Sequence, residues 1–297
     1  MADPARTKRL RYLIEGLGAL VAYGFFRAMP LRAASAVGGF LARTVGPRTG
    51  TTKRARVNLR RAMPELSEAG IERIVRGMWD NLGRVIAEYP HLGELQVYDP
   101  HGYVETVGTI RRLKDTPPAA HERYIFWSGH YGNWEICMRA ITQAGLTATA
   151  IYRAANNPYV DRLILRARGA GAGRLIPKGA AGRRAVAALH RGSHLCVLID
   201  QKMNNGIAVP FFGREAMTEI VLARLALRYN CRVVPVRVER LAGVKFRLTF
   251  EAPMDVPRTG DDAADALALM TRINARLEEW VRERPDHWLW LHRRWPD

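Results

Sequence analysis

The sequence predicts an α/β fold with a mostly parallel central sheet flanked by helices. Short apolar runs such as YIFW and ATAIY alternate with stretches of helical periodicity such as NPYVDRLILRAR. The alternation continues through residues 194–240, in HLCVLID, TEIVLARLALRYN and CRVVPVRVER. Such alternation forms parallel sheets, because each helix carries the chain back to the edge where the next strand begins. With 297 residues and 48% hydrophobic content, the chain can bury a sizeable core, as one large or two smaller domains.

The segment before this alternation, residues 67–89, predicts a long amphipathic helix. Its apolar residues recur every three or four positions and therefore lie on one face: Ile71, Ile74, Val75, Met78, Leu82, Val85 and Ile86. Ser67 is placed to cap the amino end of this helix. We interpret the helix as scaffold and assign it no chemistry.

Residues 1–45 predict a membrane-associated helical segment, and residues 46–297 the main domain. Three basic residues precede an apolar run from Leu13 to Phe26, which only Glu15 interrupts, and a second apolar run covers residues 33–42. A membrane span needs about 20 apolar residues, so a transmembrane helix would be short here. An interfacial helical hairpin fits at least as well. Because no convincing small-residue cleavage site follows, we expect a retained anchor and not a signal peptide.

The charge of the chain favours polyanionic partners. Lys and Arg total 46 against 28 Asp and Glu, a formal net charge of +18. Thirteen of the basic residues and only two acidic ones occur through residue 61, a bias that suits an anionic cytoplasmic membrane leaflet. Nucleic-acid binding is disfavoured, because the charges flank apolar helices and no aromatic-interleaved basic motif is present.

Three cysteines, Cys137, Cys196 and Cys231, lie far apart in the sequence without a C-x-x-C pair. Neither a disulfide framework nor a zinc site is indicated, and ordinary core cysteines in a reducing compartment are the favoured interpretation.

Three polar residues follow predicted strands directly: His130, Arg153 and Asp200. Open α/β sheets bind ligands outside the carboxyl ends of their strands, so these residues are candidates for a site. Other chemistries lose support, because the chain lacks a G-x-S-x-G elbow, a P-loop and a strand-linked G-x-G-x-x-G. The glycine-rich GAGAGR at 169–174 follows a helix and is interpreted as a helix-ending loop.

The stretch FWSGHYGNWEI places His130 in a loop after a strand and Glu135 in the first turn of the next helix. If the loop folds back, Glu135 can hold the imidazole in one tautomer. A base with an orienting carboxylate is suited to taking a proton from an alcohol that attacks an acyl carbon. Alternatively, Glu135 only favours the helix amino terminus by its charge. Ser128 is disfavoured as a nucleophile, because it needs a sharp turn to reach His130.

The His-x4-Glu pair resembles the signature of the glycerolipid acyltransferase superfamily, which is His-x4-Asp or His-x4-Glu. Within it, the chain is similar to the late acyltransferases of lipid A biosynthesis, the lauroyl and myristoyl transferases. The resemblance extends from about residue 12 to residue 295. It is carried by segments in the family's order: NLRRAMPELS, MWDNLGRVIAEY, GHYGNWE, YRAANNPYVDRLILRARG, LIDQ, VPFFGREAMT and RPDHWLWLHRRW.

The resemblance implies that His130 is the general base and Glu135 its partner. Arg168, which is paired with Arg166, and Arg153 match motif arginines that can bind a phosphate or stabilise an oxyanion. Helix-surface or salt-bridge roles are the alternatives for these arginines.

Three further positions, Asp200, Phe211 and Phe212, take an expected role from the same resemblance. Asp200 matches an Asp-Gln step, where it is expected to orient an arginine or the acceptor. Lys202 stands where the family commonly has an acidic residue, so the resemblance does not fix the identity of the acceptor. Phe211 and Phe212 resemble the segment that lines the acyl pocket. Thr218 is predicted to cap the next helix. For Trp288, Trp290 and Trp295, a place in the core is favoured over contact with a membrane interface.

The expected function is acyl transfer from acyl carrier protein or coenzyme A to a hydroxyl of a lipid A precursor. The expected location is the cytoplasmic face of an inner membrane. The expected partners are acyl carrier protein, a phosphorylated glycolipid and an anionic membrane surface, and no nucleic acid. We expect neither a metal nor a cofactor beyond the acyl thioester co-substrate. The alternatives are an acyl-CoA-dependent enzyme that acts on another (glyco)lipid, and a non-catalytic lipid-binding relative.

Overall fold

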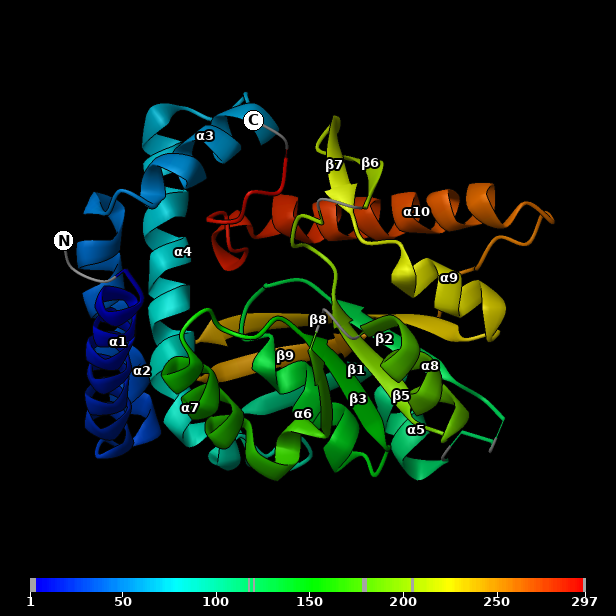
Figure 1. The fold of residues 1–297 in the computed structure, drawn as a ribbon, viewed down its shortest axis with the longest axis horizontal. Coiled ribbons are helices and arrows are strands. Elements are labelled where there is room, and N and C mark those ends of the chain that lie inside the picture. The colour runs from blue at the N-terminus through cyan, green and yellow to red at the C-terminus, as the bar shows by residue number, and fades with distance from the viewer. Residues whose placement is uncertain (1–3, 117, 120, 178–180, 204–205, 296–297) are drawn as a thin grey trace.

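The computed structural model describes residues 4–116, 118–119, 121–177, 181–203 and 206–295. Its centre is a seven-stranded sheet in the order β1-β9-β8-β2-β5-β3-β4 (Figure 1). The strands, in the order of the sheet, are β1 (Val104–Gly108), β9 (Lys245–Phe250), β8 (Arg232–Ala242), β2 (Tyr124–Ser128), β5 (His194–Leu198), β3 (Ala148–Tyr152) and β4 (Arg174–Pro177). Neighbouring strands of this sheet are parallel except β8 and β9, which are antiparallel. The predicted fold class is therefore confirmed.

The central strand β2 is apolar because helices cover both of its faces. Ile125 and Trp127 belong to one hydrophobic cluster, which includes side chains of α8 (Ala181–His190), α9 (Val221–Arg228) and α10 (Asp262–Glu283). Tyr124 and Phe126 belong to the other cluster, with α5 (Ile110–Asp115) and α6 (Glu135–Gln143). A strand that is buried on both faces needs an apolar residue at every position, which explains the unbroken run YIFW.

The predicted helix at 67–89 is α4 (Glu68–Glu88), and Ser67 caps it by accepting a hydrogen bond from the Gly70 amide at 3.2 Å. Three helices precede it: α1 (Pro4–Arg27), α2 (Leu31–Val45) and α3 (Thr52–Ala62), with the short η1 (Gly46–Arg48) between α2 and α3. The helices α2 and α4 approach closely at two glycines, because a Cβ on Gly38 would lie 2.5 Å from the Gly83 carbonyl oxygen. Figure 1 shows α1 and α2 beside α4 at one end of the molecule.

The helix α1 leaves one apolar stripe exposed: Leu10, Leu13, Ile14, Leu17, Leu20, Val21 and Phe25. Among the described residues, no helix combines the length and the apolar composition that crossing a bilayer requires. The helix α2 ends at Val45, and the predicted division of the chain at residue 45 stays a prediction.

The remaining elements are η2 (Tyr89–Glu94), α7 (Pro158–Arg168), η3 (Gly169–Ala172), η5 (Pro285–His287) and the hairpin of β6 (Ile207–Phe211) with β7 (Arg214–Thr218). Trp288, Trp290 and Trp295 are buried, as the core interpretation predicts, and the three cysteines are buried and free. GAGAGR does end a helix, since Gly169 follows α7 with φ +54°.

The predicted cap at Thr218 is wrong. Thr218 is the last residue of β7, and its hydroxyl donates to the Ala216 carbonyl at 2.8 Å. The helix α9 begins at Val221, and the Glu219 carboxylate accepts hydrogen bonds from the amides of Ile220 (3.1 Å) and Val221 (3.3 Å). A carboxylate at this end also complements the positive end of the helix dipole.

Candidate active site

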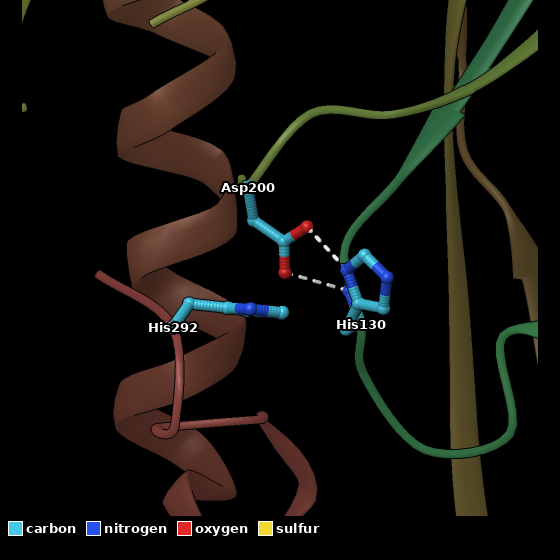
Figure 2. A group of neighbouring side chains, drawn as sticks. All are labelled: His130, Asp200 and His292. Atoms are coloured by element: carbon cyan, nitrogen blue, oxygen red, sulfur yellow. Dashed lines mark hydrogen bonds and ion pairs between the residues drawn. The ribbon is translucent and has the colours of Figure 1, made fainter. Parts of the chain in front are cut away.

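His130 and Asp200 meet because the strands that precede them are neighbours. β2 leads to His130, β5 leads to Asp200, and the two strands pair in parallel, so their carboxyl ends lie together. Asp200 Oδ1 lies 2.7 Å from His130 Nδ1, and Asp200 Oδ2 accepts from the His130 backbone amide at 2.7 Å (Figure 2). An ionised carboxylate only accepts, so Nδ1 carries the proton and Nε2 is left as the basic nitrogen.

The Asp200 carboxylate is fully buried, yet it is well satisfied. Besides the two contacts with His130, its Oδ2 accepts a hydrogen bond from Trp288 Nε1 at 2.8 Å. Burial alone would raise the pKa of Asp200, but the charge of His130 and the hydrogen bonds from it outweigh burial and hold this pKa below its usual range. Asp200 is therefore an ionised partner for an imidazole that becomes charged.

Two aromatic rings flank the His130 imidazole. The ring centroid of His292 lies 4.7 Å away and that of Trp134 5.0 Å away. Burial, and then the charge of His130, lower the pKa of His292 to about 4, so His292 is neutral at physiological pH. His130, Asp200 and His292 have potential metal-ligand atoms within 4.8 Å of one another. However, the Asp200 oxygens already accept three hydrogen bonds, and a metal bound between Asp200 Oδ1 and His130 Nδ1 would displace the one from Nδ1. The donor set therefore fits acid–base chemistry better.

Glu135 has a different partner from the one expected. Arg168 binds it through two hydrogen bonds, from Nε to Oε2 at 2.8 Å and from Nη2 to Oε1 at 2.7 Å. The Tyr89 hydroxyl and Trp134 Nε1 also donate to Oε1, at 2.7 and 3.1 Å. The expected pairing of Glu135 with His130 is thus replaced by two separate pairs. The physical reason is that β5 brings Asp200 to Nδ1, while α7 and η2 surround the first turn of α6 with donors.

The electrostatics of this second pair follow from the same contacts. Burial raises the pKa of Glu135, but the hydrogen bonds and charge of Arg168 outweigh it, so the pKa is lowered overall. Burial, followed by the charge of Glu135, raises the pKa of Tyr89 well above 10. Glu135 is therefore ionised, and Tyr89 is a neutral hydrogen-bond donor to it.

His130 lines one cavity of about 160 Å³ at the carboxyl edge of the sheet, together with both members of the Glu135–Arg168 pair. Its polar lining includes His130, Glu135, Arg168, Gln201 and Glu219. Its apolar lining comes from both faces of the sheet, with Leu195, Leu222 and Leu225 from one hydrophobic cluster and Met138, Ala150 and Cys196 from the other. A base at the edge of an apolar cavity can act on the head of a chain whose tail is buried.

The structure separates the other predicted residues into two groups. Arg153 lines the cavity, although it is exposed and has Asn156 as a hydrogen-bond partner at 3.4 Å. Arg166 is exposed on α7, outside the cavity lining. Ser128 is buried and is likewise absent from the lining.

The predicted pocket role of Phe211 and Phe212 does not match their position. Neither belongs to the lining of the cavity. The Phe211 ring stacks on Trp295 with centroids 5.6 Å apart, and the Phe212 ring lies 5.9 Å from that of Trp290. They fill the core beside the C-terminal tryptophans, because the β6–β7 hairpin packs there.

Sequence reasoning missed the polar anchor beneath the loop that carries His130. Asn133 Nδ2 donates to Glu88 Oε2 at 2.8 Å, and Glu88 accepts two hydrogen bonds from Arg240, at 2.6 and 3.0 Å. Asn81 Nδ2 donates to the Gly132 carbonyl at 3.0 Å. The helix α4 is therefore more than scaffold. The available signal was that Asn81 and Glu88 stand seven residues apart on its otherwise apolar face.

A second missed contribution comes from the C-terminal segment. The His287 carbonyl accepts from the Gly132 amide at 3.0 Å, and the His130 carbonyl accepts from the Leu289 amide at 3.1 Å. With the bond from Trp288 to Asp200, this segment holds the loop and the carboxylate together. No local pattern in the sequence indicates contacts between positions so far apart.

Transfer of an acyl group to a hydroxyl requires a base beside an apolar pocket for the acyl chain. The comparisons with known proteins place this protein among the enzymes that catalyse such a transfer, the O-acyltransferases. The chain belongs to the bacterial lipid A biosynthesis acyltransferase family, whose model matches residues 4–297. It is 26% identical over 250 residues to lipid A biosynthesis acyltransferase 1 of Shigella flexneri, covering 80% of this chain and 73% of that protein. It is also 26% identical over 253 residues, with the same two coverages, to the lipid A biosynthesis myristoyltransferase of Escherichia coli (strain K12).

Proposed function

We propose that this protein transfers a fatty acyl chain from a thioester donor to a hydroxyl of a lipid A precursor. The observation that carries the proposal is the His130–Asp200 pair, whose imidazole lines a cavity with mostly apolar walls. The names of the two relatives favour lipid A as the acceptor.

In the proposed mechanism, the acceptor hydroxyl donates its proton to Nε2 of His130 as its oxygen attacks the thioester carbonyl carbon. Asp200 stabilises the imidazolium that forms, as the carboxylate of a catalytic triad does. The tetrahedral intermediate then collapses, the carbon–sulfur bond breaks, and the thiol leaves with the proton that His130 returns. An ester bond has formed and a thioester bond has broken, so neither an oxidant nor a reductant is involved.

Glu135 has the role of holding Arg168 in this proposal. The two hydrogen bonds between them fix the guanidinium at the cavity, where it can bind a phosphate of the acceptor. Arg153 is a second cation at the same cavity. This arrangement favours a phosphorylated glycolipid as acceptor.

Acyl carrier protein and coenzyme A are the two proposed donors. Both are acidic, and the net charge of +18 supports electrostatic steering of either one.

We place the protein at the cytoplasmic face of an inner membrane, with α1 lying on the lipid surface. The exposed apolar stripe of α1 and the basic residues near it support this location. An amphipathic helix can bury such a stripe among the lipid headgroups without crossing the bilayer.

The test is an assay in vesicles with a lipid A precursor that lacks one acyl chain, using acyl carrier protein and coenzyme A thioesters in separate reactions. We expect the precursor to gain the mass of one acyl chain with the wild type and not with His130→Ala. His101→Ala is the matched control, because His101 is exposed and lies outside the cavity lining. Absence of both transfer and donor hydrolysis with the wild type would count against the proposal. A mass gain in a different lipid would identify another acceptor.

A further inference from the structure

The geometry points to Gln201 as the group that binds the thioester carbonyl oxygen and stabilises the negative charge that develops on it. This inference rests on the proposed acyl transfer and adds a catalytic residue to it. Gln201 Nε2 lies 3.4 Å from His130 Nε2, and both side chains line the cavity.

Two consecutive residues just beyond the end of β5 contact the two nitrogens of one imidazole. Asp200 binds His130 at Nδ1, and Gln201 lies against Nε2. The attacking hydroxyl must bind Nε2, and the carbonyl carbon must lie next to that hydroxyl for the bond to form. The entering hydroxyl takes the place of the Gln201 amide at His130 Nε2. The displaced amide is then next to the carbonyl group, where its N–H can donate to the carbonyl oxygen.

Three other donors at the cavity, Arg168, Trp134 and Arg153, have hydrogen-bond partners other than His130. Arg168 uses Nε and Nη2 to bind Glu135, and Trp134 Nε1 also donates to Glu135. Arg153 is exposed and contacts Asn156. Arg139 also lines the cavity, and its buried Nε has no hydrogen-bond partner in the described part of the chain. Among the cavity-lining residues that the structure describes, Gln201 is the neutral donor within hydrogen-bond distance of His130 Nε2.

A side-chain amide suits this task because it donates a hydrogen bond without titrating. As the acceptor oxygen bonds to the carbonyl carbon, the carbonyl electron pair moves onto oxygen, and the Gln201 N–H donates to it. When the electron pair returns, the thiolate leaves and takes the proton from His130. Removal of one such donor typically lowers kcat by about 10²–10³.

The first experiment compares three variants, with the donor concentration varied up to saturation. We expect Gln201→Ala to lower kcat by about 10²–10³ with a smaller change in the donor KM. Gln201→Glu should be at least as damaging, because a carboxylate repels the developing oxyanion. Gln96→Ala is the matched control, because Gln96 is exposed, donates to the Gly93 carbonyl and is outside the cavity lining. If Gln201 only shields His130 Nε2 and does not bind the carbonyl oxygen, Gln201→Ala keeps or raises kcat. That result overturns the inference.

The second experiment reads the carbonyl contact directly, through binding of two donor analogues. One is a lauroyl-CoA analogue in which a methylene replaces the sulfur, so that a ketone keeps the carbonyl. The other is the lauryl thioether of CoA, which has no carbonyl. We expect Gln201→Ala to weaken the ketone and leave the thioether unchanged. Equal weakening of both analogues, or of neither, overturns the inference.

The two experiments also separate this inference from the proposed function. The analogue measurements need no acceptor lipid, so they test Gln201 even where the wild type acts on another lipid. Failure of the wild type to transfer or hydrolyse any acyl thioester would instead contradict the proposed function.

Discussion

Asp200 contacts His130 at two points, the imidazole Nδ1 and the backbone amide, and both distances are 2.7 Å. One contact sets the tautomer of the ring and the other fixes the loop that carries it. The carboxylate that serves this histidine is therefore the one seventy residues later in the sequence, and not the Glu135 of the same motif.

The first prediction separates the roles of these two carboxylates. Asp200→Asn lets the amide donate to Nδ1, which places the proton on Nε2, so we expect kcat to fall by about 10⁴. Glu135→Gln loosens Arg168 and leaves the His130 tautomer intact, so the acceptor KM should rise more than kcat falls. Steady-state kinetics with varied acceptor measure both effects. If Asp200→Asn keeps kcat within a few-fold of the wild type, the assignment of the partner is wrong.

The second prediction concerns the turn after His130. Gly132 has φ +57°, and a Cβ there would lie 2.0 Å from the Val238 carbonyl oxygen. Gly145 also has positive φ, +80°, but nothing lies within 4 Å of its Cβ position. We expect Gly145→Ala to cost about 1–2 kcal/mol in the free energy of unfolding, from backbone conformation alone. Gly132→Ala should cost clearly more and abolish transfer. Equal unfolding midpoints in denaturant for the two variants would contradict this view.

The third prediction tests the anchor beneath the loop. Glu88→Ala leaves the buried Arg240 guanidinium without its carboxylate, and we expect it to destabilise the fold by about 3–5 kcal/mol. The double variant Glu88→Leu with Arg240→Met removes both charges and should recover part of that loss. Its kcat should stay low, because Asn133 has lost the acceptor that holds the loop. Denaturant unfolding and kcat are measured on the same preparations. Recovery of kcat together with stability would show that the anchor does not position the site.

The fourth prediction is a loss of stability in mild acid. Burial, followed by nearby positive charge, lowers the pKa of His194 to about 4, of His287 to about 3 and of His292 to about 4. In the unfolded chain these pKa values are about 6.5. Between about pH 6.5 and 4 the unfolded chain therefore binds more protons, and the free energy of unfolding falls as the pH falls. Each histidine contributes a slope of up to roughly 1.4 kcal/mol per pH unit.

His194→Gln is the variant for this test, because it keeps an acceptor for the Tyr124 amide and His194 is outside the cavity lining. We expect its unfolding midpoint in denaturant to vary less between pH 7 and pH 5 than that of the wild type. An identical pH dependence would mean that His194 does not contribute.

The fifth prediction addresses the exposed stripe of α1. We expect Ile14→Glu combined with Val21→Glu to reduce flotation with anionic vesicles, because both side chains are more than half exposed and apolar. Leu267→Glu is the matched control, since Leu267 is an exposed leucine on α10. Equal flotation of the control and the double variant would mean that α1 is not the lipid-binding surface.

The elements that the sequence predicts well are those whose pattern is local. The apolar runs that became β2, β5 and β8 lie in buried strands, and the periodic stretch 67–89 is a helix with its cap where Ser67 stands. The antiparallel pairing of β9 with β8 was not predicted, because strand pairing depends on residues that are distant in the chain. For the same reason, Thr218 was taken for a cap although β7 extends through it.

The residues of the site show the same difference between local and long-range signals. His130, Glu135 and Arg168 were found because their motifs are compact in sequence, and all three line the cavity. Asp200 was noted at a strand end, but its role depends on β5 being the neighbour of β2, which no local pattern encodes. Tyr89, Gln201 and His292 were missed, because each meets the site only after the chain has folded.

The segment from His287 to Leu289 forms hydrogen bonds with the Gly132 amide, the Asp200 carboxylate and the His130 carbonyl. With His292, which follows it closely, this segment is the last part of the site to be synthesised, since the histidine loop, β5, β8 and α10 all precede it. During translation, His130 and Asp200 are therefore made before the segment whose hydrogen bonds hold the loop and the carboxylate in place. A nascent chain can form its sheet early, but it acquires a competent centre only after this stretch has left the ribosome.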